Sequence, residues 1–180
     1  NLRARLAPED RRCFAFFHPA MPDEPLIFVE VALTTEIPQR IDNVLALNRD
    51  ADAASAATTA VFYSISNCQS GLAGISFGNF LIKRVAGHLR QELPNLSRFV
   101  TLSPVPGLMK WMSAAHPDLS TEFSGVDDRF WSEDAEGLPA DFTRAALEYL
   151  TVSGPPAGSP NDPVARFHLG HGAFPEQLNY

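Results

Sequence analysis

The sequence is poor in cysteine and has no long apolar segment. Cys13 and Cys68 are the only two cysteines among its 180 residues, too few for a disulfide framework or a cysteine-rich metal site. We expect both to be buried free thiols in a reducing compartment, the cytoplasm. No run of about 18 apolar residues occurs, so we expect no membrane partner, and no signal-peptide pattern precedes the first expected strand.

Basic residues are also scarce. The chain has 14 Lys and Arg residues against 21 Asp and Glu, with a formal net charge of −7 and a pI near 5.1. Because a basic surface supplies most of the affinity for nucleic acid, this balance argues against a nucleic-acid partner. The apolar content of 45% and the charged content of 19% are those of a globular chain. The length is that of one ordinary domain.

Strand and helix patterns alternate along the chain, which predicts an α/β fold with a mixed central sheet flanked by helices. The expected strands are 11–17, 26–33, 59–66 and 96–102. The expected helices are 37–47, 77–92, 108–115 and 142–152, and 153–163 is a Gly- and Pro-rich loop. Three prolines within 18–25 predict a turn, so the first two strands would form an antiparallel hairpin.

A glycine-rich segment lies between an apolar strand and a helix. Gly71, Gly74 and Gly78 follow the strand-like residues 60–65 and lead into the expected helix 77–92. Backbone N–H groups and the helix dipole converge at such a junction, which predicts a phosphate or pyrophosphate site. Simple turn glycines remain the alternative.

The glycine segment is neither a Walker pattern nor a dinucleotide fingerprint. From Gln69 to Gly74 it loosely resembles the Q/R-x-x-G-x-G/A loop with which the GNAT acetyltransferase fold holds the pyrophosphate of coenzyme A. In that fold an acyl-CoA lies between two splayed parallel strands, which would be 61–66 and 99–103 here. The expected order of elements agrees with this acetyltransferase-like fold.

Two side chains are candidates for chemistry. Ser103 follows an expected strand, and Pro104 and Pro106 fix the backbone after it, so the hydroxyl is either aimed by the prolines or only begins a turn. No G-x-S-x-G elbow surrounds it, which argues against a hydrolase nucleophile. His168 lies among glycines that leave room for a ligand, and it is either a proton donor or a structural histidine bonded to backbone.

The histidines do not have the spacing of a metal site. His18, His88 and His116 lie in expected turn, helix-surface and loop contexts, and His168 with His171 alone is weak evidence for a ligand pair. We therefore expect no metal.

Several strings, in order along the chain, resemble the malonyl-CoA decarboxylase family. They are His18–Leu33, Phe62–Ser66, Gly71–Ile75 with Phe80–Arg84, Phe99–Gly107 with Trp111, and Asp162–Gly170. The resemblance extends over residues 1–180 and implies a single catalytic domain with an acetyltransferase-like fold. Members of the family usually have a helical domain before this region and continue beyond the histidine motif, so we expect those two parts to be absent from this chain.

The resemblance also implies a site and a reaction. It assigns Ser103 and His168 as the catalytic pair of a carboxy-lyase that converts malonyl-CoA to acetyl-CoA and CO₂. It implies that the acyl-CoA lies against a set of residues in the glycine segment, and that no metal, biotin or other cofactor takes part. Those residues are Ala73, Gly74, Ile75, Ser76, Phe77, Gly78 and Asn79.

Two other functions are compatible with the same residues. One is an acyl-CoA-dependent N-acyltransferase, which would need an amine pocket and a base. The other is a CoA- or acyl-CoA-binding regulatory module that has lost catalysis through truncation. The stretch between Ser103 and His168 also looks shorter than in family members with a long helical insert. The sequence leaves open whether the protein is a monomer or a homo-oligomer.

Overall fold

The computed structural model describes residues 8–46, 54–72, 77–124, 139–151, 153–154 and 159–179. It divides into two compact units, Asn1–Leu102 and Ser103–Tyr180, and each is described by itself. The expected residues Ala73, Gly74, Ile75 and Ser76 lie outside the described part of the chain. No helix in the described part is long and apolar enough to cross a membrane.

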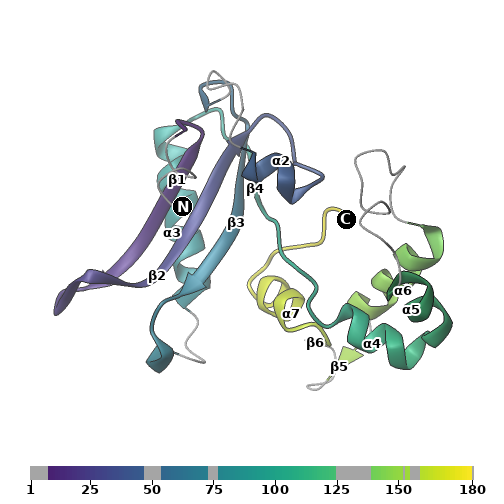
Figure 1. Ribbon diagram of the computed structural model, residues 1–180. Coiled ribbons are helices and arrows are strands. Elements are labelled where there is room, and N and C mark those ends of the chain that lie inside the picture. The colour runs from purple at the N-terminus through teal and green to yellow at the C-terminus, as the bar shows by residue number, and fades with distance from the viewer. Residues whose placement is uncertain are drawn as a thin grey trace. The chain divides into compact units, whose positions relative to one another are not determined.

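The first unit is a four-stranded sheet with helices (Figure 1). Its strands are β1 (Arg11–His18), β2 (Met21–Thr34), β3 (Thr59–Asn67) and β4 (Arg98–Thr101), in the order β1-β2-β3-β4. Its helical elements are α2 (Ile41–Leu45), the short 3-10 helix η2 (Ser70–Leu72) and α3 (Phe77–Glu92). β1 and β2, and β2 and β3, pair antiparallel, whereas β3 and β4 pair parallel. The prediction of an α/β fold with a mixed sheet is thereby confirmed.

The core of the first unit lies between the sheet and α3. Alternate residues of β2 point to this face, because successive side chains of a strand point to opposite sides. They are Ile27, Val29, Val31 and Leu33, each no more than 1% exposed. α3 contributes Leu81, Val85 and Leu89, whose spacing of four residues aligns them on one helix face. α3 therefore covers one side of the sheet (Figure 1).

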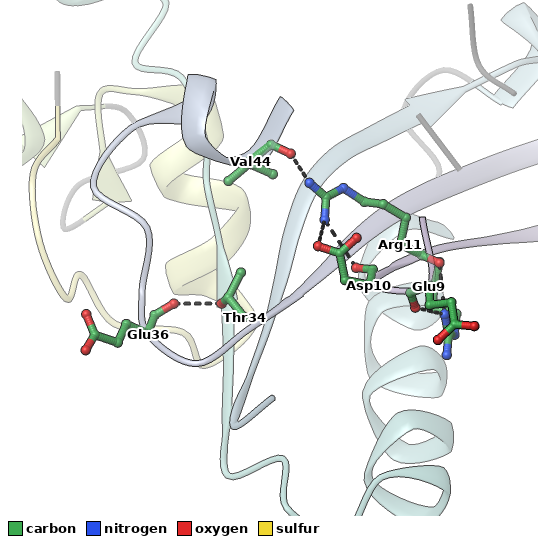
Figure 2. A network of polar contacts seen from close by, with 7 residues as sticks. Glu9, Asp10, Arg11, Thr34, Glu36 and Val44 are labelled. Atoms are coloured by element: carbon green, nitrogen blue, oxygen red, sulfur yellow. Dashed lines mark hydrogen bonds and ion pairs between the residues drawn. The ribbon is translucent and has the colours of Figure 1, made fainter. Parts of the chain in front are cut away.

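The opposite face of the sheet is covered in part by α2. Val44 packs there against Ala32 and Val61. A polar network lies beside this contact: the Arg11 guanidinium donates to a carboxylate oxygen of Asp10 at 2.8 Å and also to the carbonyl oxygen of Val44 (Figure 2). The side chains of Arg11 and Asp10 are each only 4% exposed. Through Arg11, this buried ion pair connects the beginning of β1 to α2.

The parallel pair separates after a short stretch. Its register begins at Thr59 opposite Arg98 and ends at Phe62 opposite Thr101. One further hydrogen bond runs from the Leu102 N–H to the Phe62 carbonyl at 3.0 Å. Among the residues that the structure describes, β3 then continues to Asn67 paired with β2. The edge of β3 beyond Phe62 is thus not paired with β4, as expected for two splayed strands.

The second unit is mainly helical. It contains α4 (Leu108–Ala115), α5 (Pro117–Ser124), α6 (Ala140–Thr151) and α7 (Pro163–Gly170), with a small antiparallel pair of β5 (Ser153–Gly154) and β6 (Ser159–Pro160). Its core is a cluster of side chains from α4, α5 and α6. The largest of them are Met112, Phe123, Phe142 and Tyr149.

Most element predictions are confirmed, but several bounds are wrong. The turn at 18–25 shrinks to two residues, because β2 already begins at Met21. Pro22 and Pro25 are accommodated because the register with β1 shifts on both sides of Phe17, and prolines are tolerated at such irregularities. The helix expected at 37–47 is the five-residue α2, and the strand expected at 96–102 is the four-residue β4.

Other predictions differ more strongly from the structure. α5 and α7 were not predicted, and the expected loop 153–163 contains β5 and β6. The prediction that both cysteines are buried is wrong, since Cys13 and Cys68 are exposed. Cys13 pairs with Glu30 on the edge strand β1, whereas its neighbours Phe14 and Phe16 pack on the α3 side. Because side chains alternate along a strand, Cys13 points to the other side of the sheet. Fewer side chains pack against β1 on that side, so Cys13 is exposed.

Candidate active site

Ser103 is the first residue after the sheet unit. It follows Leu102 directly and is exposed. Pro104 and Pro106 come next, and their rings fix the backbone dihedral φ of both positions. The segment ends at Gly107, the N-cap residue of α4. A short, stiff connection with an exposed hydroxyl at its first residue is the local environment of Ser103.

α7 carries His168 and has a well-defined start. Asp162 is the N-cap residue, and one carboxylate oxygen accepts hydrogen bonds from the N–H groups of Val164 at 2.9 Å and Ala165 at 2.8 Å. Pro163 occupies the first helical position, where no N–H is needed. Asp162 is 1% exposed. This cap fixes where the helix begins. Because His168 lies five residues after Pro163, the cap also fixes the helix face on which His168 lies.

The structure brings Ser103 and His168 together. The Ser103 hydroxyl oxygen lies 3.0 Å from Nε2 of His168, a hydrogen bond between residues 65 positions apart. Both residues belong to the second unit. A hydroxyl and an imidazole at this distance can exchange a proton with each other or with a bound molecule. The two residues that the sequence interpretation paired are therefore within hydrogen-bonding distance of each other.

The surroundings lower the pKa of His168 below its usual value near 6.5. Burial is the larger cause, because it disfavours the charged imidazolium, and the neighbouring His171 adds a smaller effect of the same sign. Nδ1 of His171 lies 2.5 Å from the carbonyl oxygen of Phe167. Since a carbonyl can only accept, this nitrogen carries a hydrogen. The imidazolium of His168 is consequently a stronger acid than that of an exposed histidine.

His168 is not part of a triad within the described residues. In that part of the chain no carboxylate bonds to its ring, and its backbone carbonyl accepts from the N–H groups of His171 and Ala173, each at 3.1 Å. Those two bonds hold the end of α7 in place. The residues that the structure describes also contain no group of three or more His, Cys, Asp or Glu side chains that could hold a metal ion. The chemistry of the described residues is thus that of a hydroxyl–imidazole dyad.

The expected coenzyme A residues are only partly described. Phe77, Gly78 and Asn79 form the first turn of α3, which has 16 residues and no acidic residue in that turn. Gly78 is buried, and both of its neighbours are half-buried. A helix start without negative charge favours an anion through its free N–H groups and its dipole. That these residues contact an acyl-CoA stays a prediction.

Two residues beside the dyad escaped the sequence interpretation. Asp162 caps α7, and the Tyr149 hydroxyl donates to its second carboxylate oxygen at 3.3 Å. The dipeptide Asp162-Pro163 is a helix-start signal, with an N-cap residue followed by proline at the first helical position. That signal predicts the start of α7, whereas no local pattern predicts the contact with Tyr149.

Comparison with known proteins identifies the family. The sequence pattern of the malonyl-CoA decarboxylase C-terminal domain matches residues 1–180. The crystal structure of malonyl-CoA decarboxylase from Rhodopseudomonas palustris is 52% identical, with a TM-score of 0.76 over 95% of this chain and 42% of that one. The one from Agrobacterium vitis is also 52% identical, with a TM-score of 0.77 over 94% of this chain and 44% of that one.

Curated animal relatives are more distant or match in part. Mouse mitochondrial malonyl-CoA decarboxylase is 32% identical over 211 aligned positions, which cover all of this chain and 43% of the mouse protein. The goose protein of the same name is 45% identical over 114 residues, 62% of this chain and 22% of that protein. The chain thus spans less than half the length of these relatives. The match of the C-terminal-domain pattern along the whole chain, with the close structural agreement, shows that the chain belongs to the malonyl-CoA decarboxylase family.

Proposed function

We propose that the protein decarboxylates malonyl-CoA to acetyl-CoA and CO₂, with Ser103 and His168 as its catalytic residues. The observation that carries this proposal is the hydrogen bond of 3.0 Å between the Ser103 hydroxyl and the His168 imidazole in a chain of this family. The names of the relatives supply the substrate. In the dyad, His168 is the proton source, and it is hydrogen-bonded to Ser103, which is exposed and can be reached by a substrate.

The reaction requires a proton and a place for negative charge. The bond between the carboxylate carbon and the adjacent carbon breaks, CO₂ leaves, and the electron pair moves onto the thioester carbonyl oxygen as an enolate. His168 gives the proton on Nε2 to the carbon, and water returns a proton to the imidazole afterwards. Ser103 donates a hydrogen bond to the substrate carboxylate or accepts one from the protonated Nε2 of His168. The lowered pKa of His168 makes its imidazolium a stronger acid, but it also leaves a smaller fraction of His168 protonated near neutral pH.

The same proposal assigns a role to the start of α3. The pyrophosphate of coenzyme A binds the backbone N–H groups of residues 73–79, where the helix dipole is positive. The support for this assignment is the acid-free first turn of α3 and the buried Gly78.

A His168→Asn variant tests the catalytic role. Loss of a general acid is expected to lower kcat by about 10² to 10⁴ while acyl-CoA binding stays nearly intact, because proton transfer acts on the transition state. Ser103→Ala should lower kcat in the same way. His88→Asn is a matched control, since the His88 side chain is 60% exposed on α3. Turnover of His168→Asn close to that of His88→Asn would rule out the assigned role.

The two other functions give different results with the same protein. An N-acyltransferase would consume acyl-CoA only when an acceptor amine is present, and a binding module would bind malonyl-CoA without turnover. Release of CO₂ from malonyl-CoA without an amine distinguishes decarboxylation from both.

A further inference from the structure

Tyr149 stands between the segments that carry the two residues of the dyad. It lies on α6, is 5% exposed, and its ring packs against Trp111 with 5.4 Å between ring centroids. Its hydroxyl donates to Asp162 at 3.3 Å, at the cap of the helix that carries His168. Burial and the Asp162 carboxylate raise the pKa of Tyr149, so the hydroxyl keeps its proton and remains the donor.

The same hydroxyl occupies the space beside Gly107. A Cβ atom added at Gly107 would stand 2.1 Å from the Tyr149 hydroxyl oxygen and 3.1 Å from the ring carbon that bears it. Gly107 has an ordinary φ of −89°, so glycine is needed here for space and not for an unusual backbone. It lies four residues after Ser103, at the end of the proline segment. One side chain thus contacts the end of the Ser103 segment and the start of the His168 helix.

We propose that Tyr149 and Asp162 form a positioning pair that keeps Ser103 and His168 at hydrogen-bonding distance. The inference rests on the proposed function, and within the described residues no hydrogen bond joins the pair directly to the dyad. Asp162 fixes the start of α7 with one carboxylate oxygen and holds Tyr149 with the other. Tyr149 in turn sets how closely the backbone at Gly107 approaches. All five residues belong to the second unit.

A displacement of either segment would lengthen the contact between Ser103 and His168. Misplacement of a reacting group by about 1 Å can lower the rate by roughly a hundredfold. A positioning role therefore predicts a fall in kcat with little change in KM for malonyl-CoA. A role in stability alone predicts an unchanged kcat for the folded protein.

The test compares Tyr149→Phe with Thr151→Val in the full-length protein. Each variant loses one hydroxyl from α6, but within the described part of the chain the Thr151 hydroxyl bonds to carbonyls of its own helix. We expect kcat to fall roughly ten- to hundredfold in Tyr149→Phe, with KM nearly unchanged, and to stay unchanged in Thr151→Val. We also expect the pKa of His168, followed by NMR, to rise toward its usual value in Tyr149→Phe as the ring becomes more hydrated.

Gly107→Ala supplies a second, independent measurement. Its new methyl group meets the Tyr149 hydroxyl, so the alanine should lower kcat strongly alone and less when Tyr149→Phe has removed that hydroxyl. Folded Tyr149→Phe protein with the kcat and the His168 pKa of Thr151→Val would overturn the inference. If the wild-type protein does not release CO₂ from malonyl-CoA, the proposed function fails, whereas the His168 pKa still decides whether Tyr149 positions the dyad.

Discussion

Replacing Arg11 with methionine should destabilise the sheet unit more than any change to an exposed ion pair. The Arg11 guanidinium donates to the Asp10 side chain at 2.8 Å, to the Asp10 backbone carbonyl at 3.2 Å and to the Val44 carbonyl (Figure 2). Methionine keeps most of the apolar stem, so the variant mainly removes the charge and its donors.

The burial of the pair sets the magnitude. Both side chains are 4% exposed, and removing one partner of such a pair leaves a charge in a poorly solvated site. The expected loss in the free energy of unfolding is about 3–5 kcal/mol, a large part of the roughly 5–15 kcal/mol that stabilises a typical domain. The neighbouring Arg12 pairs with Glu92 at 3.7 Å with side chains 32% and 41% exposed. Arg12→Met should therefore cost less than about 1 kcal/mol.

Urea unfolding followed by circular dichroism measures both variants with one protocol. The double variant Asp10→Asn/Arg11→Met leaves no charged side chain at positions 10 and 11 and should recover most of the loss caused by Arg11→Met. The reasoning is refuted if Arg11→Met is no less stable than Arg12→Met. It is also refuted if the double variant is as unstable as Arg11→Met alone.

Gly74→Val should weaken the binding of CoA and malonyl-CoA alike in calorimetry and raise KM with a smaller effect on kcat; unchanged affinity would place the phosphate site elsewhere. His171→Gln should raise the pKa of His168, measured by NMR titration, because it removes the smaller of the two causes that lower it. Since that pKa is lower in the folded than in the unfolded chain, the unfolded chain binds more protons below about pH 6.5, so the free energy of unfolding should fall there as the pH drops; this slope should be weaker in His168→Asn. Although Cys13 is exposed, partial desolvation of its thiol by the surrounding protein and, to a smaller degree, Glu30 raise its pKa. Glu30→Gln should therefore speed the alkylation of Cys13, followed by mass spectrometry, and an equal rate would leave desolvation as the only cause.

Periodic patterns predicted the fold well where a helix or strand has one buried face. The expected helix 77–92 coincides with α3, because its apolar residues repeat with the helical period and pack on the sheet. The ends of β2 and β4 could not be predicted, since they depend on which neighbour each strand meets. α5 begins at Pro117, and Asp118 lies in its first turn. Both are helix-start signals, but a proline followed by an aspartate is also common in turns, so the pair alone did not predict a helix.

The candidate site was predictable only through resemblance to a family. Ser103 and His168 are 65 positions apart, and each alone is explained better by a structural role, as a turn residue or as a histidine bonded to backbone. Their proximity follows from how α7 packs within the second unit, which no local pattern encodes. The exposure of Cys13 has a similar origin, because which face of an edge strand is covered depends on the elements that pack against the sheet. Tertiary contacts decided these features.

The two prolines after Ser103 also reduce the conformational entropy that residues 103–106 could lose when a ligand binds. Each ring restricts its own φ to about −65° and disfavours helical dihedrals in the residue before it, so Ser103 and Val105 are restricted as well as Pro104 and Pro106. Fixing the backbone of one free residue costs about 1–2 kcal/mol of conformational entropy. Much of that entropy is already lost in residues 103–106 before any ligand arrives. If malonyl-CoA is the substrate, as proposed, binding energy from its coenzyme A part then remains available to strain or orient the carbon atoms that react.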